Sequence, residues 1–106
     1  MRSRLLFTIV VCLTFLVIQH VAQADDHQFR FKAPDAKSVE LMCECNGWKS
    51  VQMTKGDDGV WTTKVPLNNG TYGYKFLVNG TDWMLDPDNS NKKSVDGVEN
   101  SAIEIK

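Results

Sequence analysis

The stretch Thr71-Tyr72-Gly73-Tyr74-Lys75-Phe76-Leu77-Val78 decides the fold class, because two kinds of side chain alternate along it without a break. Its even-numbered residues are aromatic or apolar, whereas Gly73, Lys75 and Leu77 stand between them. A β-strand directs successive side chains to opposite faces. The stretch therefore predicts a strand whose aromatic face lies in a core and whose Lys75 points away from that core.

Segments on both sides of this strand alternate in the same way. Further strands are expected at residues 28–32, 39–45, 51–53, 60–65, 83–85 and 101–106. Turn signals separate them, among them Asn46-Gly47 and two hairpin signals, Asn68-Asn69-Gly70 and Asn79-Gly80, while residues 86–97 are expected to form a polar loop. Short strands about every eight to twelve residues predict an all-β fold, an immunoglobulin-like antiparallel β-sandwich.

The amino end has the composition of a secretory signal. Arg2 and Arg4 precede an apolar run from Leu5 to Ile18, and Ala22-Gln23-Ala24 supplies the small residues of a cleavage site. The run is shorter than the roughly 20 residues that a membrane-spanning helix needs. We expect a signal peptide over residues 1–24, one domain over residues 25–106, a secreted or periplasmic location, and no membrane association after cleavage.

Charge and residue types narrow the function. Removing Arg2 and Arg4 from the 12 basic residues leaves ten against 13 acidic ones, which argues against a nucleic-acid partner. His27 is the only histidine of the expected mature chain. Carboxylates lie in predicted turns, such as Asp57-Asp58, where Asp is preferred for its hydrogen bonds to the backbone. We therefore expect a binding domain and not an enzyme, with no catalytic residue, no metal site and no cofactor.

Cys43 and Cys45 form a C-x-C pair within the segment expected to be a strand. Residues two apart on a strand have Cα atoms about 6.5–7 Å apart, at the limit of disulfide geometry. The sequence thus predicts two small buried residues that point to the same side and stay unbridged.

The tryptophans divide into two groups. Trp61 alternates in step with Val65 and is expected in the core. Trp48 and Trp83 follow turns, outside the alternating pattern. They either cap the ends of the sandwich or form exposed aromatic platforms of the kind that suit the apolar faces of sugar rings.

An ordered set of segments resembles carbohydrate-binding module family 48, which includes the glycogen-binding domain of the AMP-activated protein kinase β subunit and the early-set domains of isoamylases and branching enzymes. The set comprises Phe29-Arg30-Phe31-Lys32-Ala33-Pro34, Val39-Glu40-Leu41, Asn46-Gly47-Trp48, Gly59-Val60-Trp61, Gly70-Thr71-Tyr72, Tyr74-Lys75-Phe76, Asn79-Gly80, Trp83, Asp86-Pro87-Asp88-Asn89 and Asn100-Ser101. It covers nearly all of the chain after residue 24.

The resemblance implies an early-set β-sandwich that binds α-1,4-glucan such as glycogen, starch or maltodextrin. It also implies that the carbohydrate-contacting residues are Trp48, Lys75, Trp83 and Asn100. Cys45 replaces a core phenylalanine of the family, and Asp96 and Val98 replace a leucine and a threonine that flank the sugar. The alternative function is that of an early-set module that binds another exported protein instead of sugar, since a fold does not fix a function.

Overall fold

The computed structural model describes residues 25–106, which form an all-β domain with one short 3₁₀ helix. The elements are β1 (Asp25–Lys32), β2 (Val39–Cys43), η1 (Glu44–Asn46), β3 (Val51–Gln52), β4 (Thr54–Lys55), β5 (Val60–Leu67), β6 (Gly70–Val78), β7 (Asp82–Met84), β8 (Lys92–Val95) and β9 (Val98–Ile105). Within this part of the chain no helix is long and apolar enough to cross a membrane. The expected signal peptide, residues 1–24, lies outside the described residues.

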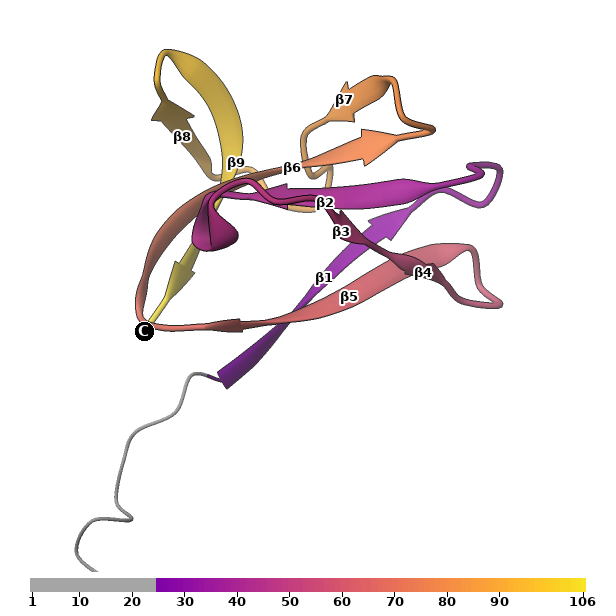
Figure 1. The fold of residues 1–106 in the computed structure, drawn as a ribbon, viewed down its shortest axis with the longest axis horizontal. Coiled ribbons are helices and arrows are strands. Elements are labelled where there is room, and N and C mark those ends of the chain that lie inside the picture. The colour runs from indigo at the N-terminus through magenta and orange to yellow at the C-terminus, as the bar shows by residue number, and fades with distance from the viewer. Residues whose placement is uncertain (1–24) are drawn as a thin grey trace, which may run out of the picture.

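The strands form two antiparallel sheets, as expected for an immunoglobulin-like β-sandwich. One sheet has three strands in the order β1-β5-β4, and the other has six, in the order β3-β2-β6-β9-β8 with β7 paired to β6. Figure 1 shows β7 and the β8–β9 hairpin on the side of β2 and β6 that faces away from β1 and β5. The six-stranded sheet therefore has an inner face toward its partner sheet and an outer face without one.

The core lies between the inner faces of the two sheets. Phe31 of β1 packs on Phe76 of β6 with ring centroids 4.7 Å apart, and Phe29 packs edge-on against Tyr74 at 5.1 Å. Trp61 is buried, and its indole Nε1 donates a hydrogen bond to the carbonyl oxygen of Ala33 at 2.9 Å. The inward orientation expected for the aromatic residues of β6 and for Trp61 is confirmed.

Two turn signals have different outcomes. Asn79 and Gly80 both have positive φ, 53° and 73°, and form the tight hairpin turn between β6 and β7. The hairpin expected at Asn68-Asn69-Gly70 is wrong, because this segment links β5 of one sheet to β6 of the other. Turn-forming residues are present in both places. Whether the two flanking strands then pair with each other depends on the more distant strands with which each of them pairs.

The polar loop expected at residues 86–97 is also wrong in its second half. Residues 92–95 form β8, and Asp96-Gly97 is a second tight turn with positive φ at both residues, 52° and 80°. Asp-Gly between strands is a strong hairpin signal, but the polar composition of β8 masked it. The last strand accordingly begins at Val98 and not at Ser101.

The first half of that loop is held by a partly buried network of hydrogen bonds. The Tyr74 hydroxyl donates to the Asp86 carboxylate at 2.6 Å, and Asn89 Nδ2 donates to the Tyr74 oxygen at 3.0 Å. The Ser101 hydroxyl oxygen accepts the Asp86 backbone N–H at 2.7 Å. Burial raises the pKa of Tyr74 well above its usual value, so this hydroxyl keeps its proton. The Asp86 carboxylate therefore serves the fold.

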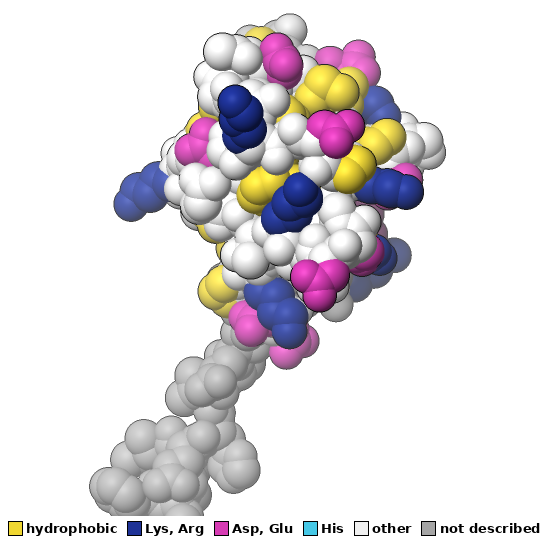
Figure 2. Space-filling view, turned by 90° about the vertical axis from the view of Figure 1, so that its right-hand side faces the viewer, with side chains coloured by type: hydrophobic (Ala, Val, Ile, Leu, Met, Phe, Trp, Pro, Cys, Tyr) yellow, Lys and Arg dark blue, Asp and Glu magenta, His cyan; other side chains and the backbone are white. Residues whose placement is uncertain are grey.

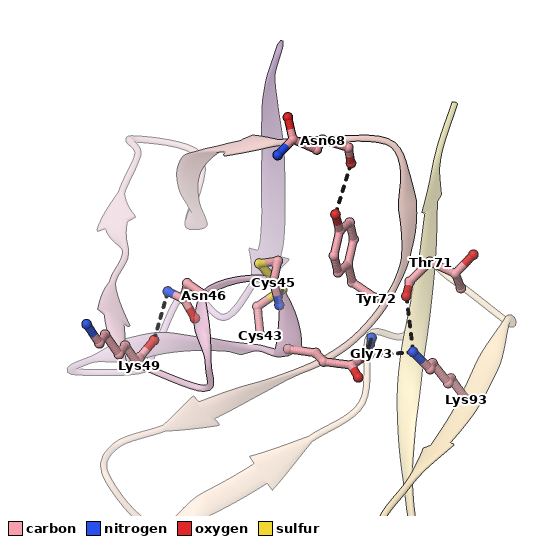
Figure 3. Close-up of a disulfide and its surroundings, with 10 residues drawn as sticks. Cys43, Cys45, Asn46, Lys49, Asn68, Thr71, Tyr72, Gly73 and Lys93 are labelled. Atoms are coloured by element: carbon pink, nitrogen blue, oxygen red, sulfur yellow. Dashed lines mark hydrogen bonds and ion pairs between the residues drawn. A yellow bond between two sulfur atoms is a disulfide. The ribbon is translucent and has the colours of Figure 1, made fainter. Parts of the chain in front are cut away.

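The expectation of unbridged cysteines is wrong in this structure. Strand β2 ends at Cys43, and the chain enters the 3₁₀ turn η1, which contains Cys45. The turn shortens the Cα–Cα distance to 5.1 Å, within the range of disulfides, and Cys43 and Cys45 are bonded. Figure 3 shows this bond at the turn.

Candidate functional site

A hollow of about 490 Å³ opens on the outer face of the six-stranded sheet. It is lined by side chains from three places: β2 and β6 below, the turn after η1 and strand β7 at the sides, and the β8–β9 hairpin. These side chains are Met42, Trp48, Lys75, Trp83, Val95, Asp96, Val98 and Asn100. All four residues predicted to contact carbohydrate are among them.

Strand register brings Lys75 and Trp83 to the same face. Lys75 of β6 lies directly opposite Met42 of β2, and Leu77, two residues further along β6, lies opposite Trp83 of β7. Directly opposed residues of an antiparallel pair share a face, as do residues two apart. The outward orientation expected for Lys75 is confirmed, and Lys75 lines the hollow.

Trp48 reaches the hollow through the turn that follows η1. Gly47 and Trp48 both have positive φ, 72° and 65°, a conformation that is rare for a bulky side chain. The Trp48 N–H donates to the carbonyl oxygen of Cys43 at 2.9 Å, and the Gly47 N–H donates to that of Glu44 at 3.2 Å. These two hydrogen bonds return the chain over the end of β2, so that Trp48 borders the outer face.

The predicted residues differ in exposure. Trp83 is 56% exposed, and Trp48 and Lys75 are partly exposed. Asn100 is only 3% exposed, so a single open patch of four residues is not what the structure has. Its Nδ2 donates to the carbonyl oxygen of Val98 at 3.0 Å. Asn100 therefore forms a recessed wall of the hollow, beside an open rim that includes Trp83.

Gly73 explains why Asn100 is recessed. A Cβ atom at this glycine would lie 3.2 Å from Val95 Cγ2 and 3.3 Å from Asn100 Cβ. The missing side chain lets the β8–β9 hairpin fold closely over β6, and the hairpin covers Asn100 as it does so.

The structure adds residues that the sequence did not single out. Met42 forms part of the floor and Val95 part of the wall. Val95 was missed because residues 86–97 were expected to form a polar loop, and an apolar Met42 on a strand gave no sign of a binding role. Asp96 and Val98, the departures from the family pattern, also line the hollow, and Val98 is 52% exposed.

The hollow combines apolar surface with few charges. Among residues 25–106, neither the Lys75 ammonium nor the Asp96 carboxylate has an oppositely charged partner within 4.0 Å in the same domain. Figure 2, which looks at one side of the domain, shows hydrophobic side chains in small groups among scattered basic and acidic ones. A site of this kind can stack aromatic rings on a flat apolar ligand face and offer isolated polar groups to its hydroxyls.

Fold and hollow together define a β-sandwich binding domain. Residues 25–106 match the family described as the glycogen recognition site of AMP-activated protein kinase, and the chain belongs to this family of carbohydrate-binding modules.

Relatives of the chain act on α-glucans. Over 59 residues the chain is 42% identical to the 1,4-alpha-glucan branching enzyme GlgB of Lactobacillus acidophilus, a match that covers 55% of this chain and 9% of that enzyme. Over 60 residues it is 40% identical to the same enzyme of Nitratidesulfovibrio vulgaris, covering 53% of this chain and 9% of that one. The chain thus matches only a small part of these relatives.

Solved structures with the same fold include two pullulanases. Type I pullulanase from Bacillus subtilis, complexed with maltose, superposes with a TM-score of 0.57 at 26% identity, over 76% of this chain and 12% of that one. The pullulanase from Bacillus acidopullulyticus superposes with a TM-score of 0.53 at 32% identity, over 76% of this chain and 11% of that one.

Proposed function

We propose that residues 25–106 bind α-1,4-glucan, such as glycogen, starch or maltodextrin, and that the protein is exported and non-catalytic. The observation that carries the proposal is the convergence of Trp48, Lys75, Trp83 and Asn100 on one hollow. Trp48 and Asn100 lie far in the sequence from the β6–β7 hairpin that carries Lys75 and Trp83, and the four residues come from four different elements or turns. Membership in a glycogen recognition family supports the same ligand class.

Each group has a role that its chemistry suits. Trp83 and Trp48 offer ring faces to the apolar C–H faces of successive glucose units. Lys75 donates hydrogen bonds to sugar hydroxyls from the floor, and Asn100 contributes its amide from the recessed wall. Because the rim leaves much of the sugar in water, the dissociation constant is expected on the order of 10 μM to 1 mM.

The test is retention on amylose resin, with elution by maltoheptaose, followed by calorimetric titration of the same sugar. Retention that maltoheptaose abolishes supports the proposal. A chain of residues 25–106 that is folded by circular dichroism and shows no heat of binding at millimolar maltoheptaose contradicts it.

The second candidate is a protein-interaction module on the same fold. The observation that favours it is the exposed apolar pair on the rim, Val98 at 52% and Trp83 at 56%. Failure to bind amylose, together with capture of a defined exported partner that Trp83→Ala abolishes, would favour this function over sugar binding.

Export rests on the predicted signal peptide. The amino terminus of the mature protein is expected at Asp25, and mass spectrometry of protein recovered from outside the cytoplasm tests this. Recovery of chains that retain Arg2 to Ala24 would contradict the proposal.

A further inference from the structure

The hollow has two walls that come from distant parts of the chain. The first wall is the turn of residues 44–48, which carries Trp48. The second wall is the β8–β9 hairpin, which carries Val95, Asp96, Val98 and Asn100. Trp48 and Asn100 are both proposed sugar contacts, so the distance between these walls affects whether one ligand can reach both.

Glu44 connects the first wall to strand β6. The pairing between β2 and β6 ends at Cys43 and Tyr74, where β2 gives way to η1. The next outward residue of β6, Gly73, donates its backbone N–H to Glu44 Oε1 at 3.0 Å. The Glu44 carboxylate therefore accepts a hydrogen bond from β6 directly beyond the last backbone pair of β2 and β6.

The same carboxylate oxygen connects the first wall to the second. Lys93 of β8 donates to Glu44 Oε1 at 2.7 Å and to the carbonyl oxygen of Thr71 at 3.1 Å. Lys93 lies directly opposite Asn100 in the β8–β9 register. Figure 3 shows Lys93, Thr71 and Gly73 on one side of the Cys43–Cys45 bond, where β2 passes into η1.

The environment favours the charged form of Glu44. The hydrogen bonds from Lys93 and from the Gly73 N–H hold the pKa of this carboxyl below its usual range. The Glu44 and Lys93 side chains are 31% and 33% exposed, whereas in the pair formed by Glu104 and Lys106 they are 56% and 86% exposed. A freely exposed ion pair contributes little, but a carboxylate that accepts from both a backbone amide and an ammonium fixes two elements relative to each other.

We infer that Glu44 is a positioning residue for carbohydrate binding, which keeps the Trp48 turn and the β8–β9 hairpin at the separation that lets one ligand contact both. This inference rests on the proposed function for its ligand. Glu44 does not line the hollow, so it acts through Trp48 on one side and through Lys93 and Asn100 on the other.

The experiment compares Glu44→Gln and Glu44→Ala with the matched control Glu104→Gln. The control removes the negative charge from the exposed pair formed by Glu104 and Lys106. Maltoheptaose affinity is measured by calorimetry at neutral pH. Glu44→Ala is expected to weaken binding about tenfold, and Glu44→Gln, which keeps an acceptor for the Gly73 amide, about threefold. Glu104→Gln is expected to leave the affinity unchanged. Equal affinities for the wild type and the three variants would overturn the inference.

A second measurement needs no sugar. In nuclear magnetic resonance spectra of the free protein, Glu44→Ala is expected to shift the Gly73 amide, the Trp48 indole N–H and the Asn100 side-chain amide, whereas Glu104→Gln leaves all three in place. If the wild type binds no maltoheptaose, the proposed function fails while these shifts still test the positioning role. Unmoved Trp48 and Asn100 resonances in a folded Glu44→Ala protein would overturn it.

Discussion

The two faces of the six-stranded sheet use the same strands for opposite purposes. On the inner face, Leu41 and Phe76 have no exposed surface at all. Their chain neighbours Met42 and Lys75 are partly exposed on the outer face and form the floor of the hollow. Along β2 and β6, residues that stabilise the fold therefore alternate with residues that are proposed to bind sugar.

The faces differ because only one of them is covered. The inner face is closed by β1 and β5, so burial of apolar surface there stabilises the domain. The outer face is bordered by β7, the Trp48 turn and the β8–β9 hairpin, which enclose space without filling it. Substitutions on the inner face should therefore change stability, and those on the outer face should change binding.

The largest expected effect is in the core, where β5 of the three-stranded sheet covers the inner face. Trp61→Ala removes a buried indole and its hydrogen bond to Ala33, and should lower the free energy of unfolding by about 3–5 kcal/mol. Urea unfolding monitored by far-ultraviolet circular dichroism measures this. An unchanged unfolding midpoint would show that Trp61 does not belong to the core.

The outer face gives the next largest effect. Trp83→Ala should weaken maltoheptaose binding by roughly 1–3 kcal/mol through loss of apolar contact, while the melting temperature stays near that of the wild type, because this side chain is largely exposed. Titration and thermal melts of the same sample check both halves. Wild-type affinity in Trp83→Ala would place the binding site elsewhere.

A smaller effect is expected where the chain passes from the inner face to the outer one. The Cys43–Cys45 bond constrains a loop of three residues, and the chain-entropy relation assigns it about 1.5 kcal/mol of stability. Cys45→Ser should lower stability by about that amount, and denatured wild-type protein of residues 25–106 should contain no free thiol. Two titratable thiols per chain in protein purified without reductant would contradict the bond.

The smallest effect is the loss of stability as the pH falls. His27 on the core side and Glu44 on the outer side should lose their contributions in different pH windows. Burial lowers the pKa of His27, which packs against Phe29 on the inner side of β1, below its usual 6.5. The unfolded chain then binds more protons, so this contribution is complete above pH 6.5 and is lost as the pH falls. The pKa of Glu44, on the outer side, is held below its usual 4.5, so its contribution is lost only below pH 4.5.

Thermal melts of residues 25–106 between pH 3 and 8 separate the two contributions. His27→Gln should remove the part of the pH dependence just below 6.5 and leave the part below 4.5, and Glu44→Gln should do the reverse. A His27→Gln protein with an unaltered slope between these two values would show that this histidine is not desolvated.

Much of the fold and of the candidate site could be predicted from local patterns. Alternation along residues 71–78 correctly separated Lys75 from Tyr74 and Phe76. The off-pattern positions of Trp48 and Trp83 set them apart from the core but left end caps and exposed platforms as alternatives, and both side chains line the hollow. These predictions succeed because the faces of a strand follow from its two-residue period. The recessed place of Asn100 could not be predicted, since it depends on how closely a distant hairpin approaches Gly73.

The sequence by itself determined the strand class, the turn at Asn79-Gly80 and the two faces of each long strand, because these depend on neighbouring residues alone. Only the tertiary structure decided that residues 68–70 join two sheets, that a 3₁₀ turn brings Cys43 and Cys45 within bonding distance, and that Glu44 meets Lys93 across 49 residues of sequence. Sheet partners and such long-range contacts are selected by the packing of the whole domain, which no local pattern contains.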